Sequence, residues 1–401
     1  MPRDLDASAD LYAWYATLRR DEPVHYLPRE EMWAVTRYED VVSILRNPGA
    51  FSSASGMGDL LTGNIGAAGS RRPSPFSLGE TGVRVLIATD PPDHTILRRL
   101  VSRAFTPRAV AALESRVRAL TEGMVDDLLE AGEAGDVVAQ LATPLPVVVI
   151  AELLGIPPER RVDFKRWSDD FVGGLSGTLD VSAAQRSGAE LFSYFTEVVA
   201  ERTARPGEDL ISLLVTGGRD GESALGPVEI VLFCILLLVA GNETTTNLIT
   251  NGVAALLDHP DAARRLREEP SLVPSAIEEV LRYDAPVQGL PRGTTRPVEL
   301  GGTWLPEGAR VLALFGSANR DEHHFHEADR FLVDRSPNDH LGFGAGIHLC
   351  VGAPLARLEA RVVAETLFRR VRRLEPTAEA QRLESPILRG FARFPVHAMP
   401  A

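Results

Sequence analysis

Cysteine is nearly absent from this chain of 401 residues, which holds only Cys234 and Cys350. Two cysteines so far apart in sequence provide neither a disulfide framework nor the closely spaced ligands of a zinc site. This scarcity fits a reducing compartment, and we expect the protein in the cytoplasm.

Positive charge and long apolar runs are scarce as well. The chain has 42 Lys and Arg against 55 Asp and Glu, a net charge of −13, which disfavours binding to nucleic acid or anionic membranes. The longest apolar run, Ile230 to Ala240, is too short to span a bilayer, and the N-terminus lacks an apolar signal core. We therefore expect a soluble protein, and its 44% of hydrophobic residues can form a large core.

The spacing of the hydrophobic residues predicts a mainly α fold with a minor β portion. We expect helices near 9–20, 38–46, 93–132, 145–155, 159–173, 185–204, 227–257, 260–268, 272–284 and 352–371. Strands are expected near 24–36, 286–315 and 383–399. The glycine-rich segment 55–82 predicts a mobile loop.

The most informative segment runs from Phe343 to Gly352 and places Cys350 on a glycine-rich loop before a helix. Glycines let backbone N–H groups approach a sulfur, and the positive end of a helix dipole favours a thiolate. An isolated cysteine is more often a small buried hydrophobic residue. Here the surroundings indicate an anionic cysteine, and haem iron is a cation that such a cysteine can face.

This segment resembles the haem-binding loop of the cytochrome P450 family, Phe-x-x-Gly-x-(His/Arg)-x-Cys-x-Gly, and matches every fixed position. The resemblance is clearest from Asp90 to the C-terminus. It implies one P450 domain over residues 1–401, with haem b between the long helix around Gly241 and the helix after Cys350. Cys350 would be the axial ligand of the iron, in a cofactor-binding loop that includes Phe343, Gly344 and Gly352.

A second motif, Ala240 to Thr245, interrupts the apolar pattern of the long helix with a glycine, an acid and hydroxyls. The resemblance implies that Gly241 leaves room for dioxygen, that Thr244 hydrogen-bonds the oxygen at the iron and that Glu243 passes protons inward. The simpler alternative is that the threonine hydroxyls only bond back to helix carbonyls.

A third motif, Glu279 and Arg282, places an acid and an arginine three residues apart on one helical face. Alone it could be a surface ion pair. The resemblance implies a buried structural network completed by a second arginine, which we assign to Arg330.

Cationic residues for the two haem propionates are also implied by the resemblance. His94 and Arg98 follow Asp90-Pro91-Pro92 and lie four residues apart on one helical face. Arg292 and His348 complete the expected set. Each of these side chains, taken alone, would more often be a solvated surface group.

The resemblance implies a monooxygenase that inserts one oxygen atom from O2 into a small-to-medium, mostly apolar organic substrate. Electrons would come from NAD(P)H through a ferredoxin reductase and a ferredoxin, and the enzyme would be a monomer. The pocket would be lined by loop 76–88, Phe171, Leu175, Leu237, Ala240, Val287, Leu290, Ile387 and Leu388.

Two surface features remain ambiguous. Arg99, Arg103, Arg108, Arg357 and Arg361 could dock an acidic ferredoxin or could be ordinary solvated positions. The tract from Asp321 to Glu327 is rich in histidine, but we expect a variable polar loop there and no metal site.

Three other functions of the same fold stay open: a peroxide-driven haem-thiolate enzyme, a nitric-oxide reductase and a non-enzymatic haem-binding sensor. The pair Glu243 and Thr244 argues against all three. The resemblance implies that a peroxide-driven enzyme lacks this pair and that a nitric-oxide reductase lacks the acid, and a sensor needs no proton path.

Overall fold

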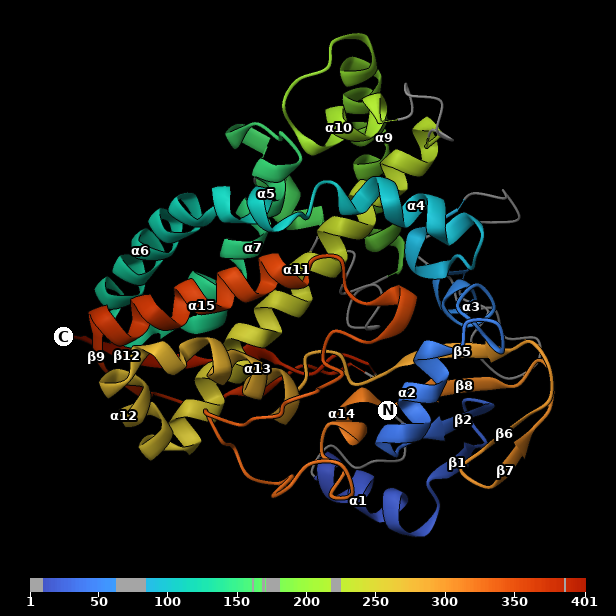
Figure 1. The fold of residues 1–401 in the computed structure, drawn as a ribbon. Helices are drawn as coiled ribbons and strands as arrows, with labels where there is room; N and C mark the ends of the chain where they lie inside the picture. The colour runs from blue at the N-terminus through green and yellow to red at the C-terminus, as the bar shows by residue number, and fades with distance from the viewer. Residues whose placement is uncertain are drawn as a thin grey trace.

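The computed structural model describes residues 10–62, 84–160, 162–167, 170, 181–217, 225–385 and 387–401. Helices make up most of this part of the chain (Figure 1). The α-helices are α1 (Leu11–Asp21), α2 (Tyr38–Arg46), α3 (Met57–Thr62), α4 (Asp93–Ser102), α5 (Pro107–Ala112), α6 (Glu114–Glu130), α7 (Pro144–Leu153), α9 (Val181–Ala204), α10 (Leu210–Thr216), α11 (Pro227–Asp258), α12 (Pro260–Glu268), α13 (Val273–Tyr283), α14 (Phe315–Ala318) and α15 (Ala353–Arg370).

The strands form a minor portion of the fold, with one five-stranded sheet and three smaller sheets in the described residues. They are β1 (Val24–Leu27), β2 (Met32–Val35), β3 (Phe51–Ser52), β4 (Gly135–Asp136), β5 (Leu290–Thr294), β6 (Val298–Leu300), β7 (Thr303–Leu305), β8 (Arg310–Ala313), β9 (Val371–Pro376), β10 (Gln381–Arg382), β11 (Phe391–Arg393) and β12 (Pro395–Pro400). A five-stranded sheet has the order β1-β2-β8-β5-β3, and β12 lies between β4 and β9. Figure 1 shows the larger sheet apart from the helical layer that holds α11 and α15.

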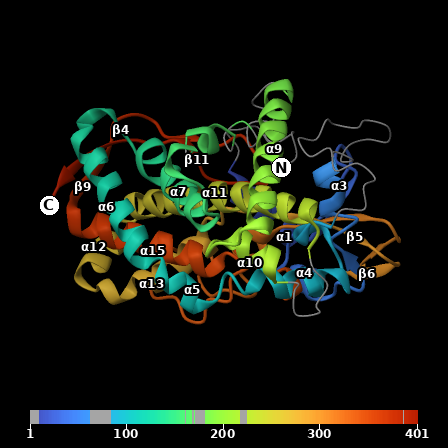
Figure 2. The same cartoon turned by 90° about the horizontal axis from the view of Figure 1, so that it is seen from above.

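Helix α11 is the long central element. Gly226 precedes it, Pro227 occupies its first turn, and the Glu229 side chain accepts a hydrogen bond from the Gly226 backbone N–H, so the start predicted from the sequence is confirmed. Its length and composition would let α11 cross a membrane, but 56% of its most apolar stretch is buried inside the fold. Figure 2 shows α9 crossing over α11, with which it is in contact.

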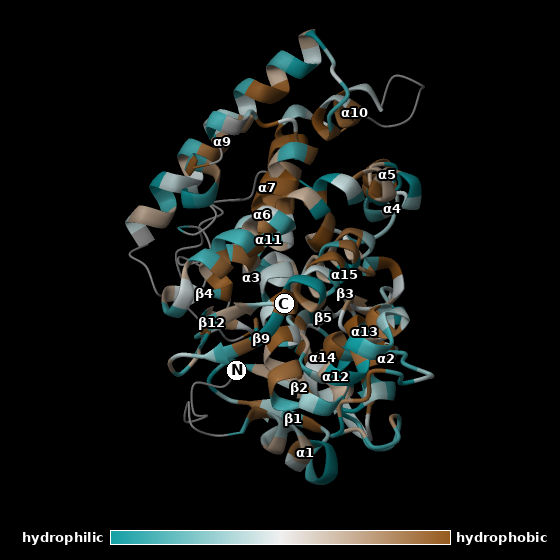
Figure 3. Ribbon diagram, turned by 90° about the vertical axis from the view of Figure 1, so that its left-hand side faces the viewer, coloured by the Kyte–Doolittle hydropathy of each residue, from teal (hydrophilic) through white to brown (hydrophobic). Residues whose placement is uncertain are grey.

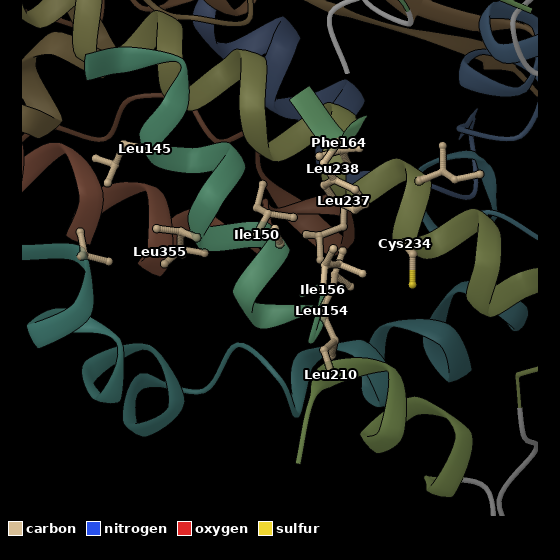
Figure 4. Packing of buried hydrophobic residues seen from close by; sticks show 14 of the residues in the cluster. Leu145, Ile150, Leu154, Ile156, Phe164, Leu210, Cys234, Leu237, Leu238 and Leu355 are labelled. Atoms are coloured by element: carbon tan, nitrogen blue, oxygen red, sulfur yellow. The ribbon is translucent and has the colours of Figure 1, made fainter. Parts of the chain in front are cut away.

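The largest apolar core lies where α7 packs against α11. Helix α7 is apolar on nearly every side (Figure 3), as expected for a helix surrounded by protein. Figure 4 shows Ile150 and Leu154 of the α7 region close to Leu237 and Leu238 of α11. Cys234 belongs to the same core, and burial raises the pKa of its thiol well above the ordinary value, so it is a core residue.

The predicted elements agree closely with the described ones, and the fold is the expected mainly α architecture. Within the segment expected to be a mobile loop, residues 57–62 form α3. Residues 63–83, and the pocket positions Phe171 and Leu175, lie outside the described residues.

Candidate active site

The cysteine loop, residues 343–352, joins the irregular segment before it to the start of α15. Gly344 and Gly346 have φ angles of 70° and 68°, which favour glycine. A Cβ at Gly346 would also lie 2.2 Å from the carbonyl oxygen of Leu45 at the end of α2, so no side chain fits there. The N–H of Cys350 donates to the carbonyl of Phe343 at 3.0 Å, which closes the loop.

The Cys350 side chain is exposed to solvent, but protein atoms surround its sulfur densely. This burial raises the pKa of the thiol above its ordinary value. Backbone N–H groups of Gly352 and Ala353 and the charges of Arg98 and Arg357 oppose the effect. The loop therefore favours a thiolate less than its sequence indicated, and a stable thiolate here calls for a cation at the sulfur.

Four nitrogen-bearing side chains from three parts of the chain gather beside this loop: His94 and Arg98 on α4, Arg292 on β5, and His348 in the loop itself. The rings of His94 and His348 have centroids 4.3 Å apart. Arg292 is 4% exposed, and its one hydrogen bond to the described residues runs from Nη1 to the carbonyl of Pro291. We call these four residues the cationic group.

The cationic group lacks matching acids among the described residues. Desolvation lowers the pKa of Arg292 to about 10 and that of His348 to about 3, and the charge of Asp90 counters only part of this. Asp90 itself accepts hydrogen bonds from Ser52 and from the backbone N–H of Ser53. Within the described part of the chain, Nε2 of His94 and Nε2 of His348 are buried without a hydrogen-bond partner.

These residues fit a haem with two propionates. An anionic ligand with two carboxylates would supply the acceptors that the buried imidazoles and Arg292 lack. A metal ion at Cys350 would supply the positive charge that its sulfur needs. The cationic group could therefore bind the propionates of a haem, and Cys350 could bind its iron.

On α11, Thr244 Oγ1 donates to the carbonyl of Ala240 at 2.6 Å, as the simpler alternative predicted. The same hydroxyl oxygen keeps lone pairs that can accept a hydrogen bond. Glu243 is half-buried beside it. A Cβ at Gly241 would lie 2.6 Å from Ile150 Cδ1, so this glycine lets α7 approach α11 closely, and its role toward dioxygen stays a prediction.

The pair Glu279 and Arg282 lies on α13, and both side chains are fully buried. Arg282 donates to both Glu279 oxygens at 2.8 and 2.9 Å, and its remaining N–H groups donate to the carbonyls of Asn319, Ala328 and Arg330. The network is buried and structural, as the resemblance implied.

The second arginine of this network is Arg335, and the assignment to the Arg330 side chain is wrong. Arg335 Nε lies 3.0 Å from Glu279 Oε2, and its side chain is 6% exposed. The Arg330 side chain is 65% exposed and pairs with Glu327, so only its backbone joins the network. We call Glu279, Arg282 and Arg335 the Glu279 network.

The expected pocket residues come from three segments, two of which lie side by side. Val287 forms an isolated β-bridge with Leu388, and the N–H of Gln288 donates to the carbonyl of Ile387 at 2.8 Å. Leu290 follows on β5, whereas Leu237 and Ala240 lie on α11. Leu237 is buried and Ala240 is exposed.

The histidine-rich tract has structural roles. The ring of His324 stacks on Tyr38 at 3.4 Å, and Phe325 is a core residue. The His326 side chain is 92% exposed. Among the described residues, no group of three His, Cys, Asp or Glu side chains is placed to hold a metal ion.

Sequence spacing did not predict two residues near the site, Glu278 and His340, whose partners are distant in sequence. Glu278 of α13 pairs with Arg357 of α15 and with His340, which precedes the cysteine loop. No local pattern joins these three positions, because the contacts cross 62 and 79 residues of chain.

Comparisons with known proteins agree with this geometry. The family model described as Cytochrome P450 matches residues 182–393. Cytochrome P450 109 of Bacillus spizizenii is 40% identical over 391 residues, covering 95% of this chain and 90% of that protein. The cytochrome P450 monooxygenase PikC of Streptomyces venezuelae is 38% identical over 400 residues, covering 98% and 92%. The crystal structure of CYP109E1 from Bacillus megaterium in complex with testosterone has a TM-score of 0.83 and 36% identity, covering 96% of this chain and 97% of that one.

The site and the fold define a haem-dependent oxidoreductase, since the matched family implies haem iron and O2. The chain belongs to the cytochrome P450 family. It is an enzyme of the monooxygenase class, like the relatives that carry that name.

Proposed function

We propose that the chain folds as one P450 domain over residues 1–401 and hydroxylates, epoxidises or oxidatively dealkylates a small-to-medium, mostly apolar substrate. The observation that carries this proposal is the cationic group, buried without matching acids, beside an accessible cysteine. Haem b, when bound, would supply the dioxygen chemistry. The residues of the chain would bind it, orient it and deliver protons.

Cys350 would ligate the haem iron, with its sulfur held by the N–H groups of Gly352 and Ala353. Phe343 and Gly344 shape the loop around it. Arg98, Arg292, His94 and His348 would bind the propionates, and bringing carboxylates to the two histidines would raise their depressed pKa values.

Glu243 and Thr244 would form the proton route. Glu243, half-buried on α11, would carry a proton from the solvent side to Thr244 Oγ1. The hydrogen bond from this hydroxyl to the Ala240 carbonyl fixes the oxygen in one position. Thr244→Ala should therefore leave haem and substrate binding intact but divert reducing equivalents to hydrogen peroxide, measured as product formed per NAD(P)H consumed. Unchanged coupling would contradict this role.

The substrate would lie among Leu237, Ala240, Val287, Leu290, Ile387 and Leu388. The contacts between the segments around Val287 and Leu388 place two of these apolar stretches together. A similar protein binds testosterone in its crystal structure, so rigid apolar molecules of that size are reasonable first candidates. Candidates can be screened by the spin-state change that follows displacement of water from the haem iron.

Electrons would come from NAD(P)H through a ferredoxin reductase and a ferredoxin, to a monomeric enzyme in the cytoplasm. The basic residues proposed for docking are partly offset by acids: Arg357 pairs with Glu278, and Arg361 with Glu114 and Glu365. Leu349, 47% exposed next to Cys350, adds apolar surface on the same side. A ferredoxin contact here would thus depend less on charge than the sequence indicated.

The decisive test is the ferrous carbonyl spectrum of the purified haem protein. We expect the red-shifted Soret band of thiolate ligation, and we expect Cys350→Ala to abolish it. A spectrum without that band would overturn the assignment. Turnover with peroxide but none with any ferredoxin system would favour a peroxide-driven enzyme, and turnover with neither would favour a sensor.

A further inference from the structure

Two adjacent acids on α13 have different partners. The Glu279 side chain points inward and pairs with Arg282 and Arg335. The Glu278 side chain is 29% exposed and faces the cysteine loop. The proposed function uses no part of Glu278. Its contacts nevertheless connect α13 to the two segments that flank Cys350.

The Glu278 carboxylate accepts three hydrogen bonds. Arg357 Nε donates to Oε1 at 2.8 Å, and Arg357 Nη2 donates to Oε2 at 2.7 Å, which is a two-point contact. His340 Nε2 lies 3.0 Å from Oε2. Burial opposes ionisation of Glu278, but these hydrogen bonds outweigh it and lower its pKa to about 2, so the carboxylate is charged at neutral pH.

His340 carries this contact into the loop. Its Nδ1 accepts the backbone N–H of Gly342 at 3.1 Å, so the ring proton is on Nε2 and is donated to Glu278. The His340 side chain is 4% exposed. Gly344, two residues after Gly342, is the first glycine of the loop with a positive φ angle. Glu278 therefore fixes both the orientation and the proton position of a ring bonded to the entry of the loop.

Arg357 carries the contact to the sulfur. Its guanidinium lies 4.6 Å from the centre of the Phe343 ring, and the Phe343 carbonyl accepts the N–H of Cys350. The positive charge of Arg357 also acts on the Cys350 sulfur. Glu278, in two-point contact with the same guanidinium, offsets part of that charge.

We propose that Glu278, through Arg357 and His340, is a positioning residue that clamps the cysteine loop between α13 and α15 and limits how much of the Arg357 charge acts on the sulfur. The inference rests on the proposed function, in which Cys350 ligates the haem iron. It assigns two separable effects to one carboxylate: a mechanical one on the loop and an electrostatic one on the iron.

The test uses the holoenzyme and the substitution Glu278→Gln. Without the negative charge, the balance around Cys350 becomes more positive, so the midpoint potential of the haem should move upward. The weakened clamp should also speed, several-fold, the loss of the thiolate Soret band of the ferrous carbonyl complex in mild denaturant. Arg357→Lys keeps the charge but loses the two-point contact, so it should speed band loss with little change of potential.

Glu114→Gln is the matched control. It removes the same charge from a partner of Arg361, the next arginine on the same face of α15, and should change neither property. The role of Glu278 is refuted if Glu278→Gln and Arg357→Lys both show the midpoint potential and the rate of band loss of the parent enzyme. The proposed function would still stand in that case, because it depends on the thiolate band of the parent enzyme. If Glu278→Gln yields no holoprotein, Arg357→Lys tests the clamp by itself. The clamp is refuted if this variant loses the thiolate Soret band at the same rate as the parent enzyme.

Discussion

Two groups of buried arginines in this molecule differ in one respect, the presence of an acid. In the Glu279 network, all five N–H groups of Arg282 have acceptors, two of them carboxylate oxygens. In the cationic group, Arg292 is nearly as buried and makes one hydrogen bond to the described residues, with a backbone carbonyl as the acceptor. The chain balances the first group itself, whereas the second calls for an anionic ligand.

The largest expected effect is the loss of Arg282 from the balanced group. Arg282→Ala would leave the buried Glu279 with Arg335 as its one cationic partner among the described residues, and removing one partner of such a pair costs about 3–5 kcal/mol. We expect little folded, haem-loaded protein, measured as the yield of holoprotein per cell mass. A normal yield would show that the Glu279 network does not stabilise the fold.

Glu359 extends the comparison, because it is a buried acid that has no cationic partner among the described residues. Glu359 on α15 is fully buried, and burial raises its pKa to about 8. The unfolded chain releases this proton near the ordinary pKa, so between the two values the folded state binds the extra proton and stability falls as pH rises. The loss by pH 7 is on the order of 3 kcal/mol.

Glu359→Gln should flatten this dependence, since an amide does not titrate. The measurement is the free energy of unfolding at several pH values from 5 to 8 for the parent and the variant. Parallel curves would show that Glu359 is charged in the folded state.

The correction from Arg330 to Arg335 can be tested with a pair of variants. Arg335→Ala removes the Nε–H that the two Glu279 oxygens share, together with three hydrogen bonds to backbone carbonyls, and should cost about 2 kcal/mol in the free energy of unfolding. Arg330→Ala removes an exposed ion pair with Glu327 and should cost less than about 1 kcal/mol. Equal costs would contradict the placement of Arg335 in the network.

The smallest effect on folding is expected in the group without an acid. Arg292→Gln removes a charge that Asp90 offsets only in part, so the yield of soluble protein should stay the same. The haem-to-protein ratio should fall, and haem should transfer faster to an acceptor globin, because a propionate loses its cationic donor. A drop in soluble protein like that of Arg282→Ala would break the distinction between the two groups.

The sequence was sufficient wherever the pattern was local. Prolines and apolar spacing located α11 and α12 almost to the residue, and a glycine-rich motif located the cysteine loop. Arg335 was missed because residues 319–341 form an irregular segment with little regular structure, in which spacing does not tell which arginine turns back to Glu279. Glu278 was missed because its partners come from distant parts of the chain.

The electrostatics of Cys350 were predicted only in part for a related reason. The motif shows the N–H groups and the helix start, which favour a thiolate, but not the density of protein around the sulfur. In the described structure that desolvation is the larger effect. A pattern of residue types indicates which groups are present, whereas their balance depends on packing from the whole fold.

Strand β12 has a consequence for how the molecule is made. It pairs with β9, which directly continues α15, and with β4 from the first half of the chain. Since residues 395–400 emerge during translation after both strands with which they pair, the sheet next to α15 closes only after the cysteine loop and α15 have been synthesised. We therefore expect haem capture to be completed only after β12 has been synthesised and has paired with β9 and β4.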